Sequence, residues 1–301
     1  MTESLTLDGR EIVLSHLDKV FFPDSGITKG DLVDYYRRIA ETALPHYRAR
    51  PLSQHRFPDG IGAEGFFQKN LPDYYPDWFD REEMKKEGGR IVHPLVDDAA
   101  SLVYIANQGC ITPHLGLARR DKPEHPDRLI FDLDPSDDDF AKVQETARLL
   151  RRLLESLELP VFVQTTGSRG LHLVVPLDRS AGFDTVRGFA QALCKHLAKR
   201  NPKLTTVEHR KAKRGDRVFL DTLRNAYGQT AVAPYAVRAI EGAPVATPLR
   251  WREAAAGDLT PRKYTIKNLF RRLARIEDPW ADIGKSAIAL GKTRERLAKH
   301  G

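Results

Sequence analysis

Two aspartates, Asp132 and Asp134, stand one residue apart at the end of an apolar run in the segment RLIFDLDPSDDDF (128–140). Two like charges this close repel each other and cost folding free energy unless a cation lies between them. Carboxylate oxygens are the ligands that Mg²⁺ and Mn²⁺ prefer, and two such ions can activate an attacking hydroxyl and stabilise a leaving oxygen in nucleotidyl transfer. A DxD pair also arises by chance at solvated strand ends, so it predicts a metal site only together with further ligands.

The spacing around the pair tests calcium binding directly. An EF-hand loop that begins at Asp132 needs glycine at its sixth position and glutamate at its twelfth. The chain has Asp137 and Val143 at those positions. The EF-hand interpretation is therefore excluded.

A second group of reactive residues lies about thirty residues further on, in TGSRGLHLVVP (166–176). It contains two glycines, a serine, an arginine and a histidine: Gly167, Gly170, Ser168, Arg169 and His172. Glycines let the backbone turn tightly and bring amide groups near a phosphate, and the other side chains supply donors and a cation. Taken alone, the same segment is typical of a hairpin turn with a polar tip.

A third group follows in DTLRNAYGQTAVAPYAVRA (221–239), which contains Asp221, Arg224 and Arg238. Arginines here could hold a triphosphate through paired hydrogen bonds, although each alone could equally be a surface residue. The basic run EHRKAKRGDR (208–217) precedes the group. Such a run is usually a solvated loop, but beside an active site it could follow a phosphate backbone.

The elements that must position these residues follow from hydrophobic periodicity. Residues 129–134 alternate with a period of two, which predicts a strand with its leucines and phenylalanine on one face and both aspartates on the other. From 137 to 157 the apolar residues recur at helical spacing, with Ser136 or Asp137 available as a cap. The remaining predicted elements are strands at 161–165 and 171–175 joined as a hairpin, a helix at 183–200 and a strand at 216–221.

The resulting order of strand, helix, strand, strand, helix, strand predicts a split βαβ arrangement within an α+β fold. In that arrangement the first and third strands are central and the fourth lies beside the first. Asp221 would then lie on one neighbour of the strand that carries Asp132 and Asp134, and His172 on the other. Sequence does not fix the register, so whether the three carboxylates face one another stays open.

The two ends of the chain are less regular. The segment ITKGDLVDYYRRIAETALPHY predicts a helix that starts near Lys29, and RFPDGIGAEGFFQKN is typical of a glycine-rich loop with two adjacent aromatics. Prolines 244, 248 and 261 punctuate the later chain, and the basic stretch from Lys263 to His300 is predicted to be helical in part.

Composition limits the class of protein. The chain has 301 residues, 41% of them hydrophobic, and a net charge of +7, which allows a real core and favours a polyanionic partner. Its two cysteines lack zinc spacing and cannot form a disulfide framework. No apolar run approaches ~18 residues and no signal-peptide pattern opens the chain. We therefore expect a protein of the bacterial cytoplasm and nucleoid with no membrane contact.

These motifs together resemble a known family. FDLDP, GSRGLH and FLD followed by LRNA and TAVAPYAVR are similar to the three motifs of the archaeo-eukaryotic primase superfamily. HLDKVFFPDSGITKGDLVDYYRRIA, RFPDGIGAEGFFQKN and IANQGCITPHLGLARRDKPEHPDRLIFDLDP are similar to the polymerase domain of bacterial DNA ligase D. The resemblance implies one polymerase domain over 1–301, with an RRM-like catalytic palm at 121–240. An N-terminal α/β module at 1–120 would pack on the palm, and an irregular or helical segment would follow at 241–301.

The resemblance also implies roles for individual residues. Matching the catalytic, metal-binding carboxylates are Asp132, Asp134 and Asp221. Matching the nucleotide contacts are Ser168, Arg169, Gly170, His172, His114, Arg224 and Arg238. Matching the DNA contacts are Lys19 and Lys29 for a downstream 5′-phosphate, Phe66 or Phe67 for stacking on a template base, and Arg56. Family members often have lysine where Arg169 stands, which keeps the charge but alters the geometry.

The activity that the resemblance implies is template-directed nucleotide addition at DNA gaps and double-strand breaks by two-metal-ion catalysis. It implies two Mn²⁺ or Mg²⁺ ions, nucleoside triphosphates including ATP as substrates, and a preference for ribonucleotides. The implied partners are gapped or broken DNA with a 5′-phosphate, a Ku end-binding protein and a ligase domain. We expect a monomer.

Two other classes are compatible with parts of the sequence. A haloacid-dehalogenase phosphatase also opens with an apolar strand that ends in DxD, but Gly and Thr or Val follow there, whereas Pro135 and Ser136 follow here. A non-catalytic module that binds DNA ends would share the lysines, the aromatics and the positive charge. The three aspartates at matching motif positions favour an enzyme.

Overall fold

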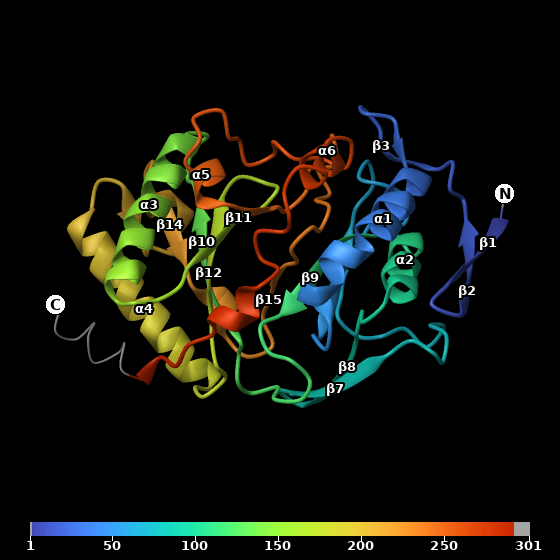
Figure 1. Cartoon of the computed structure of the whole chain (residues 1–301), viewed down its shortest axis with the longest axis horizontal. Coiled ribbons are helices and arrows are strands. Elements are labelled where there is room, and N and C mark those ends of the chain that lie inside the picture. The colour runs from blue at the N-terminus through green and yellow to red at the C-terminus, as the bar shows by residue number, and fades with distance from the viewer. Residues whose placement is uncertain (1, 292–301) are drawn as a thin grey trace. The chain divides into compact units, whose positions relative to one another are not determined.

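The computed structural model describes residues 2–291, which divide into two compact units of mixed helix and strand (Figure 1). Unit 1 contains the described residues up to Asp121, with Thr230–Ala246 and Tyr264–Ile276. Unit 2 contains Lys122–Gln229, Thr247–Lys263 and the described residues from Glu277 onward.

The division into units does not follow the predicted segments. Residues 230–240, predicted within the palm segment 121–240, belong to unit 1, and residues 241–291 are shared between both units. The physical reason is strand pairing, because Thr230–Val232 forms antiparallel hydrogen bonds with Cys110–Gly116 of unit 1. Residues 230–240 therefore belong to the unit of the strand with which they pair, although they are closer in the sequence to unit 2.

Unit 1 is built on an antiparallel sheet with the strand order β15-β9-β5-β6. Its strands are β5 (Leu52–Arg56), β6 (Phe66–Gln68), β9 (Cys110–Gly116) and β15 (Thr230–Val232). Helices α1 (Lys29–Tyr47) and α2 (Ala99–Asn107) contact each other, and their buried side chains form one hydrophobic core with residues of the sheet. A short helix, α6 (Leu269–Leu273), also belongs to this unit.

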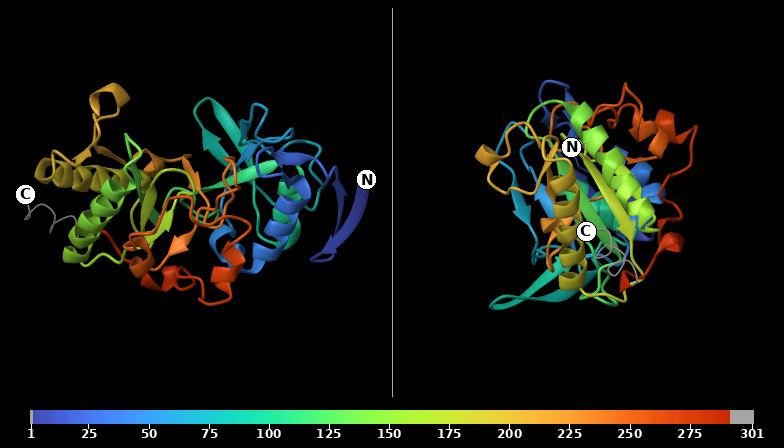
Figure 2. Two further views of the ribbon diagram at one scale, coloured as in Figure 1. Left: turned by 90° about the horizontal axis from the view of Figure 1, so that it is seen from above. Right: turned by 90° about the vertical axis from the view of Figure 1, so that its left-hand side faces the viewer.

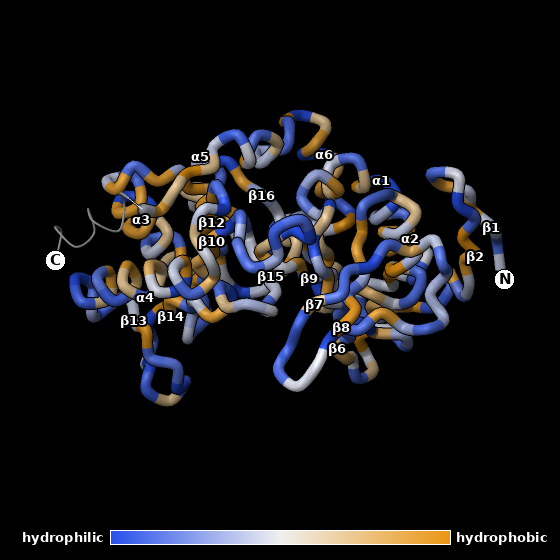
Figure 3. Tube along the Cα trace, turned by 90° about the horizontal axis from the view of Figure 1, so that it is seen from below, coloured by the Kyte–Doolittle hydropathy of each residue, from blue (hydrophilic) through white to orange (hydrophobic). Residues whose placement is uncertain are grey.

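Three two-stranded hairpins complete unit 1. They are β1 (Thr2–Leu7) with β2 (Arg10–Ser15), β3 (Val20–Phe22) with β4 (Ile27–Thr28), and β7 (Arg81–Lys86) with β8 (Gly89–Pro94). Figure 3 shows a largely hydrophilic stretch in the β7–β8 hairpin. The residues next to its turn are exposed, whereas Met84, His93 and Pro94 are buried.

Helix α1 starts at Lys29, which confirms the predicted start. Thr28 caps it: the Thr28 hydroxyl accepts a hydrogen bond from the Asp31 backbone N–H, and the Asp31 carboxylate accepts one from the Thr28 N–H. This capping box satisfies backbone donors that otherwise lack a partner at a helix start.

Unit 2 is built on a sheet with the strand order β13-β14-β10-β12-β11-β16. Its strands are β10 (Arg128–Asp134), β11 (Phe162–Thr165), β12 (Leu171–Pro176), β13 (Thr205–Thr206), β14 (Val218–Asp221) and β16 (Pro248–Leu249). The pair β13–β14 is parallel and the other pairs are antiparallel. Strands β14, β10, β12 and β11 thus lie side by side in the order that the sequence predicts.

Two long helices, α3 (Phe140–Ser156) and α4 (Phe183–Arg200), contact strand β10 from the same face of the sheet (Figure 2). The helices turn apolar stripes toward the sheet, and the fully buried Leu129, Phe131 and Leu133 are the apolar side of β10. Because side chains alternate along a strand, the aspartates of β10 point to the opposite face. Helices α3 and α4 therefore do not cover the face of the sheet that carries the aspartates.

The start of α3 differs from the prediction. The helix begins at Phe140 and is capped by Asp139, whose carboxylate accepts a hydrogen bond from the Ala141 N–H. Both residues predicted as caps have other partners: the Ser136 hydroxyl donates to the Arg217 carbonyl, and Asp137 pairs with Lys142. Of the stretch predicted as partly helical, 263–291 contains α6 and a 3₁₀ turn at Ile283–Ser286, and 292–300 lies outside the described residues.

Within residues 2–291, no helix combines the length and the apolar character that crossing a membrane requires.

Candidate functional site

Polar side chains form a row across four strands of the unit 2 sheet. Asp132 on β10 lies directly opposite Asp221 on β14 and opposite His172 on β12, and His172 in turn lies opposite Gln164 on β11. Residues in such positions share one face of the sheet with Cβ atoms ~5 Å apart. The register that the sequence left open thus brings the first and third predicted carboxylates together.

Burial raises the pKa of the Asp221 carboxyl, and the pairing of Asp221 with the neighbouring Asp132 carboxylate raises it further. A hydrogen bond from the Leu223 N–H, at 2.7 Å, and the positive charge of Arg224 act in the opposite direction. The charged form of Asp221 is therefore disfavoured beside Asp132. A cation between the two carboxylates would stabilise it.

Asp134 lies two residues along β10, and two arginines hold its carboxylate. Arg169 Nη2 is 3.0 Å from Asp134 Oδ1, and Arg214 Nη1 is 3.4 Å from Oδ2. Arg169 also donates to the Pro135 carbonyl. Each oxygen of the Asp134 carboxylate therefore faces an arginine guanidinium.

Arg214 is the more firmly held of the two arginines. It is 7% exposed, it donates to the carbonyls of Glu208 and His209, and its guanidinium lies 3.8 Å from the Phe219 ring centroid. The sequence singled out the whole basic run 208–217 and missed this one member. Its position just before the strand of the third carboxylate was the available signal.

As it stands, the site is not a closed metal centre. Among residues 2–291, no three His, Cys, Asp or Glu side chains are grouped so that they could hold a metal ion. The structure brings together Asp132 and Asp221, and it leaves Asp134 on the same face but bound to arginine. Convergence of all three carboxylates on shared cations stays a prediction.

The predicted phosphate-binding turn precedes β12. Gly167 has a φ of 66°, in the left-handed region. Gly170 is needed for a different reason: a Cβ there would lie 2.0 Å from the Leu133 carbonyl oxygen. The Thr166 hydroxyl accepts from the Ser168 and Gly170 N–H groups, and Arg262 Nε donates to the Ser168 carbonyl. The turn is thus packed tightly against β10, which fixes its polar tip beside Asp134.

Arg224 and Asn225 of the LRNA segment have different surroundings. Arg224, in a 3₁₀ turn at Leu223–Asn225, is close enough to affect the Asp221 charge. Asn225 is fully buried, and its side-chain amide donates to the Ile130 carbonyl at 2.7 Å and accepts from the Ile130 N–H at 2.8 Å. The amide therefore continues the hydrogen bonding of β10 past the end of β14. Sequence reasoning missed this role of Asn225.

The remaining predicted nucleotide contacts, His114 and Arg238, belong to unit 1. There the Phe67 ring stacks on His55, with centroids 4.2 Å apart and an interplanar angle of 2°, and contacts His114 edge-on at 5.4 Å. Burial lowers the pKa of His55, and the positive charge of Arg238 lowers it further. These residues form one aromatic and basic group on the unit 1 sheet.

Phe66 and Phe67 were predicted on a loop with one of them exposed. They lie on the short strand β6 instead, because Arg56 and His55 of β5 pair with them, and both are exposed, at 46% and 59%. Arg56 lies below this surface, 5.6 Å from the Phe66 ring, and donates to the side chains of Gln68 and Tyr74 and to the Gln108 carbonyl. Arg56 thus supports the exposed aromatic surface.

Lys19 and Lys29 meet at the start of α1, where the Lys29 N–H donates to the Lys19 carbonyl at 2.8 Å. The Lys29 side chain is buried, and its Nζ donates to the Ser15 carbonyl at 2.6 Å. Burial and then the charge of Lys19 lower the pKa of Lys29 to about 8. Lys19 itself pairs with Asp59. Two cations converge here at a helix N-terminus, which is a favourable place for an anion.

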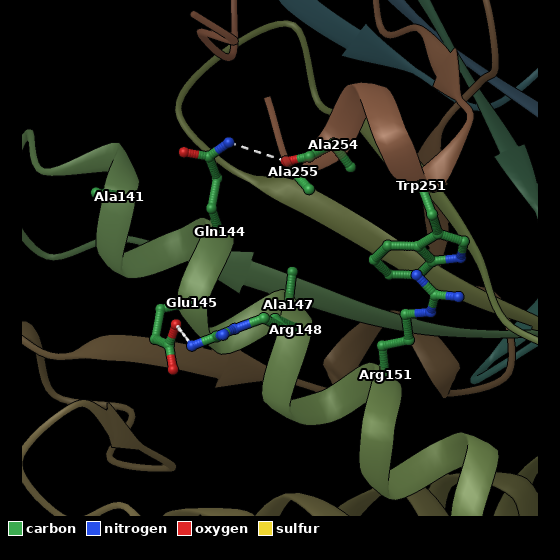
Figure 4. Close-up of a pocket in the computed structure, with 9 residues that line it drawn as sticks. All are labelled: Ala141, Gln144, Glu145, Ala147, Arg148, Arg151, Trp251, Ala254 and Ala255. Carbon is green, nitrogen blue, oxygen red and sulfur yellow. Dashed lines mark hydrogen bonds and ion pairs between the residues drawn. The ribbon is translucent and has the colours of Figure 1, made fainter. Parts of the chain in front are cut away.

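A pocket of about 540 Å³ lies elsewhere in unit 2, between α3 and α5 (Trp251–Ala254) (Figure 4). Its lining includes no predicted site residue. Its polar groups have partners already: Arg148 pairs with Glu145, Arg151 lies over the Trp251 ring, and the Gln144 amide donates to the Ala254 carbonyl. The charged and polar side chains of this pocket thus contact neighbours on α3 or the segment around α5.

The chain is similar in sequence to known proteins over most of its length. The model of the family "LigD, primase-polymerase domain" matches residues 28–280. The multifunctional non-homologous end joining protein LigD of Mycobacterium bovis is 33% identical over 278 residues, 89% of this chain and 36% of that protein. The LigD protein of Pseudomonas aeruginosa is 35% identical over 291 residues, 96% of this chain and 34% of that protein. The chain thus spans about a third of the length of these relatives.

The fold is similar to a solved structure as well. The polymerase domain from Mycobacterium tuberculosis ligase D in complex with DNA superposes with a TM-score of 0.86 at 33% identity, covering 92% of this chain and 99% of that one. The mixed helix and strand architecture and the sequence similarity therefore agree. The chain belongs to the LigD primase-polymerase domain family.

Proposed function

We propose that this chain is a template-directed nucleotidyltransferase that adds nucleotides at gaps and breaks in DNA. The observation that carries the proposal is the register of the unit 2 sheet, which puts Asp132 directly opposite Asp221. In this proposal, the unit 2 sheet with α3 and α4 is a split βαβ catalytic palm. Family membership supports it, because the solved relative is described as a polymerase domain in complex with DNA.

The donor chemistry of Asp132 and Asp221 suits Mn²⁺ or Mg²⁺, and we propose that these residues and Asp134 hold a pair of such ions. Asp132 and Asp221 offer hard oxygen donors on one face, and the raised pKa of Asp221 shows a charge that a cation would stabilise. When bound, such ions activate an attacking hydroxyl and stabilise a leaving oxygen. Asp134, which pairs with Arg169 and Arg214, would be the third carboxylate to hold the ions.

Arg169 has a proposed second partner. Its guanidinium lies at the tip of the 166–170 turn, next to Ser168 in the sequence, where it could bind a triphosphate oxygen. In the proposal Ser168, Arg169 and His172 hold the phosphates of the incoming nucleotide and Arg224 adds positive charge beside Asp221. His114 and Arg238 are proposed as further nucleotide contacts.

Unit 1 supplies the proposed DNA contacts. Lys19 and Lys29 form a site for the 5′-phosphate on the downstream side of a gap, because a phosphate dianion would offset their mutual repulsion and the burial of Lys29. The exposed Phe66 and Phe67 rings stack on a template base, and Arg56 supports them. Stacking on an aromatic ring contributes ~1–3 kcal/mol per base and tolerates any sequence.

The biological setting follows from the relatives, which are named for non-homologous end joining. We propose that the chain works in double-strand-break repair as a monomer in the cytoplasm and nucleoid, beside a Ku end-binding protein and a ligase domain. We also propose ribonucleoside triphosphates, ATP among them, as preferred substrates. The chain's net charge of +7 is in keeping with a polyanionic partner.

Primer extension on gapped DNA with a 5′-phosphate tests the proposal. The Asp132→Ala/Asp221→Ala double variant should lose nucleotide addition with every nucleoside triphosphate in Mn²⁺ or Mg²⁺ and should still bind the DNA. Asp282→Ala is the matched control, because Asp282 is exposed and pairs only with Lys285 of the same turn among the contacts that the structure describes. Unimpaired extension by the double variant would refute the proposal. Absence of extension by the unmutated chain would favour a non-catalytic end-binding module.

A further inference from the structure

Gln164 is the one member of the polar row across the unit 2 sheet to which no role has been given. It is 1% exposed on β11 and lies opposite His172, which is itself 3% exposed on β12. The amide nitrogen of Gln164 is 3.2 Å from His172 Nδ1. On the other side of the ring, His172 Nε2 is 3.5 Å from Asp132 Oδ1. The imidazole is therefore held at both nitrogens, between an amide and a predicted metal ligand.

The two contacts together decide which ring nitrogen carries the proton. A neutral imidazole has one N–H group and one lone pair. The nitrogen that faces a carboxylate oxygen must be the N–H group, because two lone pairs facing each other repel. His172 Nδ1 must then accept a hydrogen bond, and the NH₂ group of Gln164 is the donor beside it.

The other end of the Gln164 amide supports this assignment. Its Oε1 is buried and has no hydrogen-bond partner within the described part of the chain. A buried carbonyl without a partner is unfavourable, and the contact of the amide nitrogen with His172 compensates part of that cost. No stronger contact at Oε1 competes with it.

We propose that Gln164 is a positioning residue that keeps His172 in the tautomer with the proton on Nε2, so that the ring donates this proton to a phosphate oxygen of the bound nucleotide. The inference rests on the proposed function of His172. Phosphate oxygens at neutral pH only accept hydrogen bonds, so a lone pair on Nε2 would repel them. A cation held by Asp132 would make its oxygen a weaker partner for the Nε2–H group, and the Gln164 amide would still fix the tautomer from the Nδ1 side.

The experiment reads the tautomer directly. Long-range ¹H–¹⁵N spectra of the full chain with labelled histidine distinguish the two nitrogens of His172, whose signals are assigned from their loss in His172→Gln. The spectra are recorded at pH 8.5 to read the ring in its neutral form. Gln164→Met keeps the length of the side chain and removes the donor. Gln144→Met is the matched control, because its amide donates to carbonyls of Ala254 and Ala256 on the α5 side of unit 2.

The expected result has three parts. His172 in the unmutated chain and in Gln144→Met carries its proton on Nε2, and Gln164→Met gives a mixture of tautomers. Calorimetric binding of ATP with Mn²⁺ is about 2- to 10-fold weaker in Gln164→Met and unchanged in the control, in line with the loss of one hydrogen bond. A proton on Nδ1 in the unmutated chain, an unchanged tautomer in Gln164→Met, or a changed tautomer with unchanged ATP affinity overturns the inference.

Failure of this inference is distinguishable from failure of the proposed function. The tautomer is measured in the free protein and needs no catalysis, and the measurement on the unmutated chain stands even if a variant does not fold. The proposed function is tested by extension with the aspartate variants, whatever the state of His172.

Discussion

Replacing Lys29 with methionine should stabilise the fold and remove the recognition of a 5′-phosphate. The pKa of Lys29 is lowered from 10.5 to about 8, first by burial and then by Lys19. At pH 7 the folded chain therefore holds a charge that is disfavoured by up to about 3 kcal/mol relative to the unfolded chain. Removal of Lys29 also breaks the hydrogen bond from Nζ to the Ser15 carbonyl, which costs about 1.5 kcal/mol and offsets part of the gain from removing the charge. We expect Lys29→Met to raise the free energy of unfolding by about 1–2 kcal/mol.

The pH dependence has a definite sign. Between pH 8 and 10.5 the unfolded chain binds one proton more at Lys29 than the folded chain does, so the stability of the unmutated chain rises with pH across this window. Below pH 8 both states are protonated and the contribution of Lys29 is constant. The advantage of Lys29→Met, measured by urea unfolding at pH 7 and pH 10, should therefore shrink at the higher pH.

Phosphate recognition should follow the opposite trend, because it needs the charged form. The unmutated chain should bind 5′-phosphorylated gapped DNA more tightly than the unphosphorylated form at pH 7, measured by fluorescence anisotropy, and this preference should weaken above pH 8. Lys29→Met should show no preference at either pH, and Lys195→Met, on the exposed side of α4, should behave as the unmutated chain does. A Lys29→Met protein that is less stable at pH 7 and retains the preference would refute the reasoning.

Three further variants test the packing around the site. Gly170→Ala puts a Cβ 2.0 Å from the Leu133 carbonyl oxygen, so thermal unfolding should show a loss of about 3 kcal/mol or more, and a loss below 1 kcal/mol would contradict this geometry. Asn225→Ala leaves the N–H and C=O of Ile130 without side-chain partners and should cost about 2–4 kcal/mol in urea unfolding, whereas a neutral effect would show that water replaces the amide. Phe67→Ala removes an exposed ring and should weaken binding of DNA with an unpaired template base by ~1–3 kcal/mol with little change in melting temperature; equal binding would exclude the stacking role.

The sequence predicts the strands and helices of unit 2 well because local periodicity specifies them. The alternation at 129–134 identified β10, and helical spacing gave the bounds of α4 at 183–200. The strand order followed from the order of elements. Local pattern does not predict the register that places Asp132 opposite Asp221. The register depends on which hydrogen bonds form between strands that are distant in the sequence.

The residues that sequence reasoning missed are those whose roles depend on tertiary contacts. Asn225 looks like an ordinary turn residue until it bonds to Ile130, 95 positions earlier. Arg214 is one cation among several in a basic run, and only its contact with Asp134 distinguishes it. Residues 230–240, predicted within the palm segment, belong to unit 1 for the same reason, because β15 pairs with β9. Spacing along the chain carries no information about such partners.

Binding of Mn²⁺, followed by the loss of its free paramagnetic resonance signal, tests most directly whether Asp132 and Asp221 form a cation site. The unmutated chain should bind the ion in the absence of DNA and nucleotide, and Asp221→Asn should weaken this binding by at least about tenfold, which corresponds to ~1.4 kcal/mol. Asp282→Asn should leave the affinity unchanged. Equal Mn²⁺ affinity in the unmutated chain and in Asp221→Asn would show that Asp132 and Asp221 do not form a cation site.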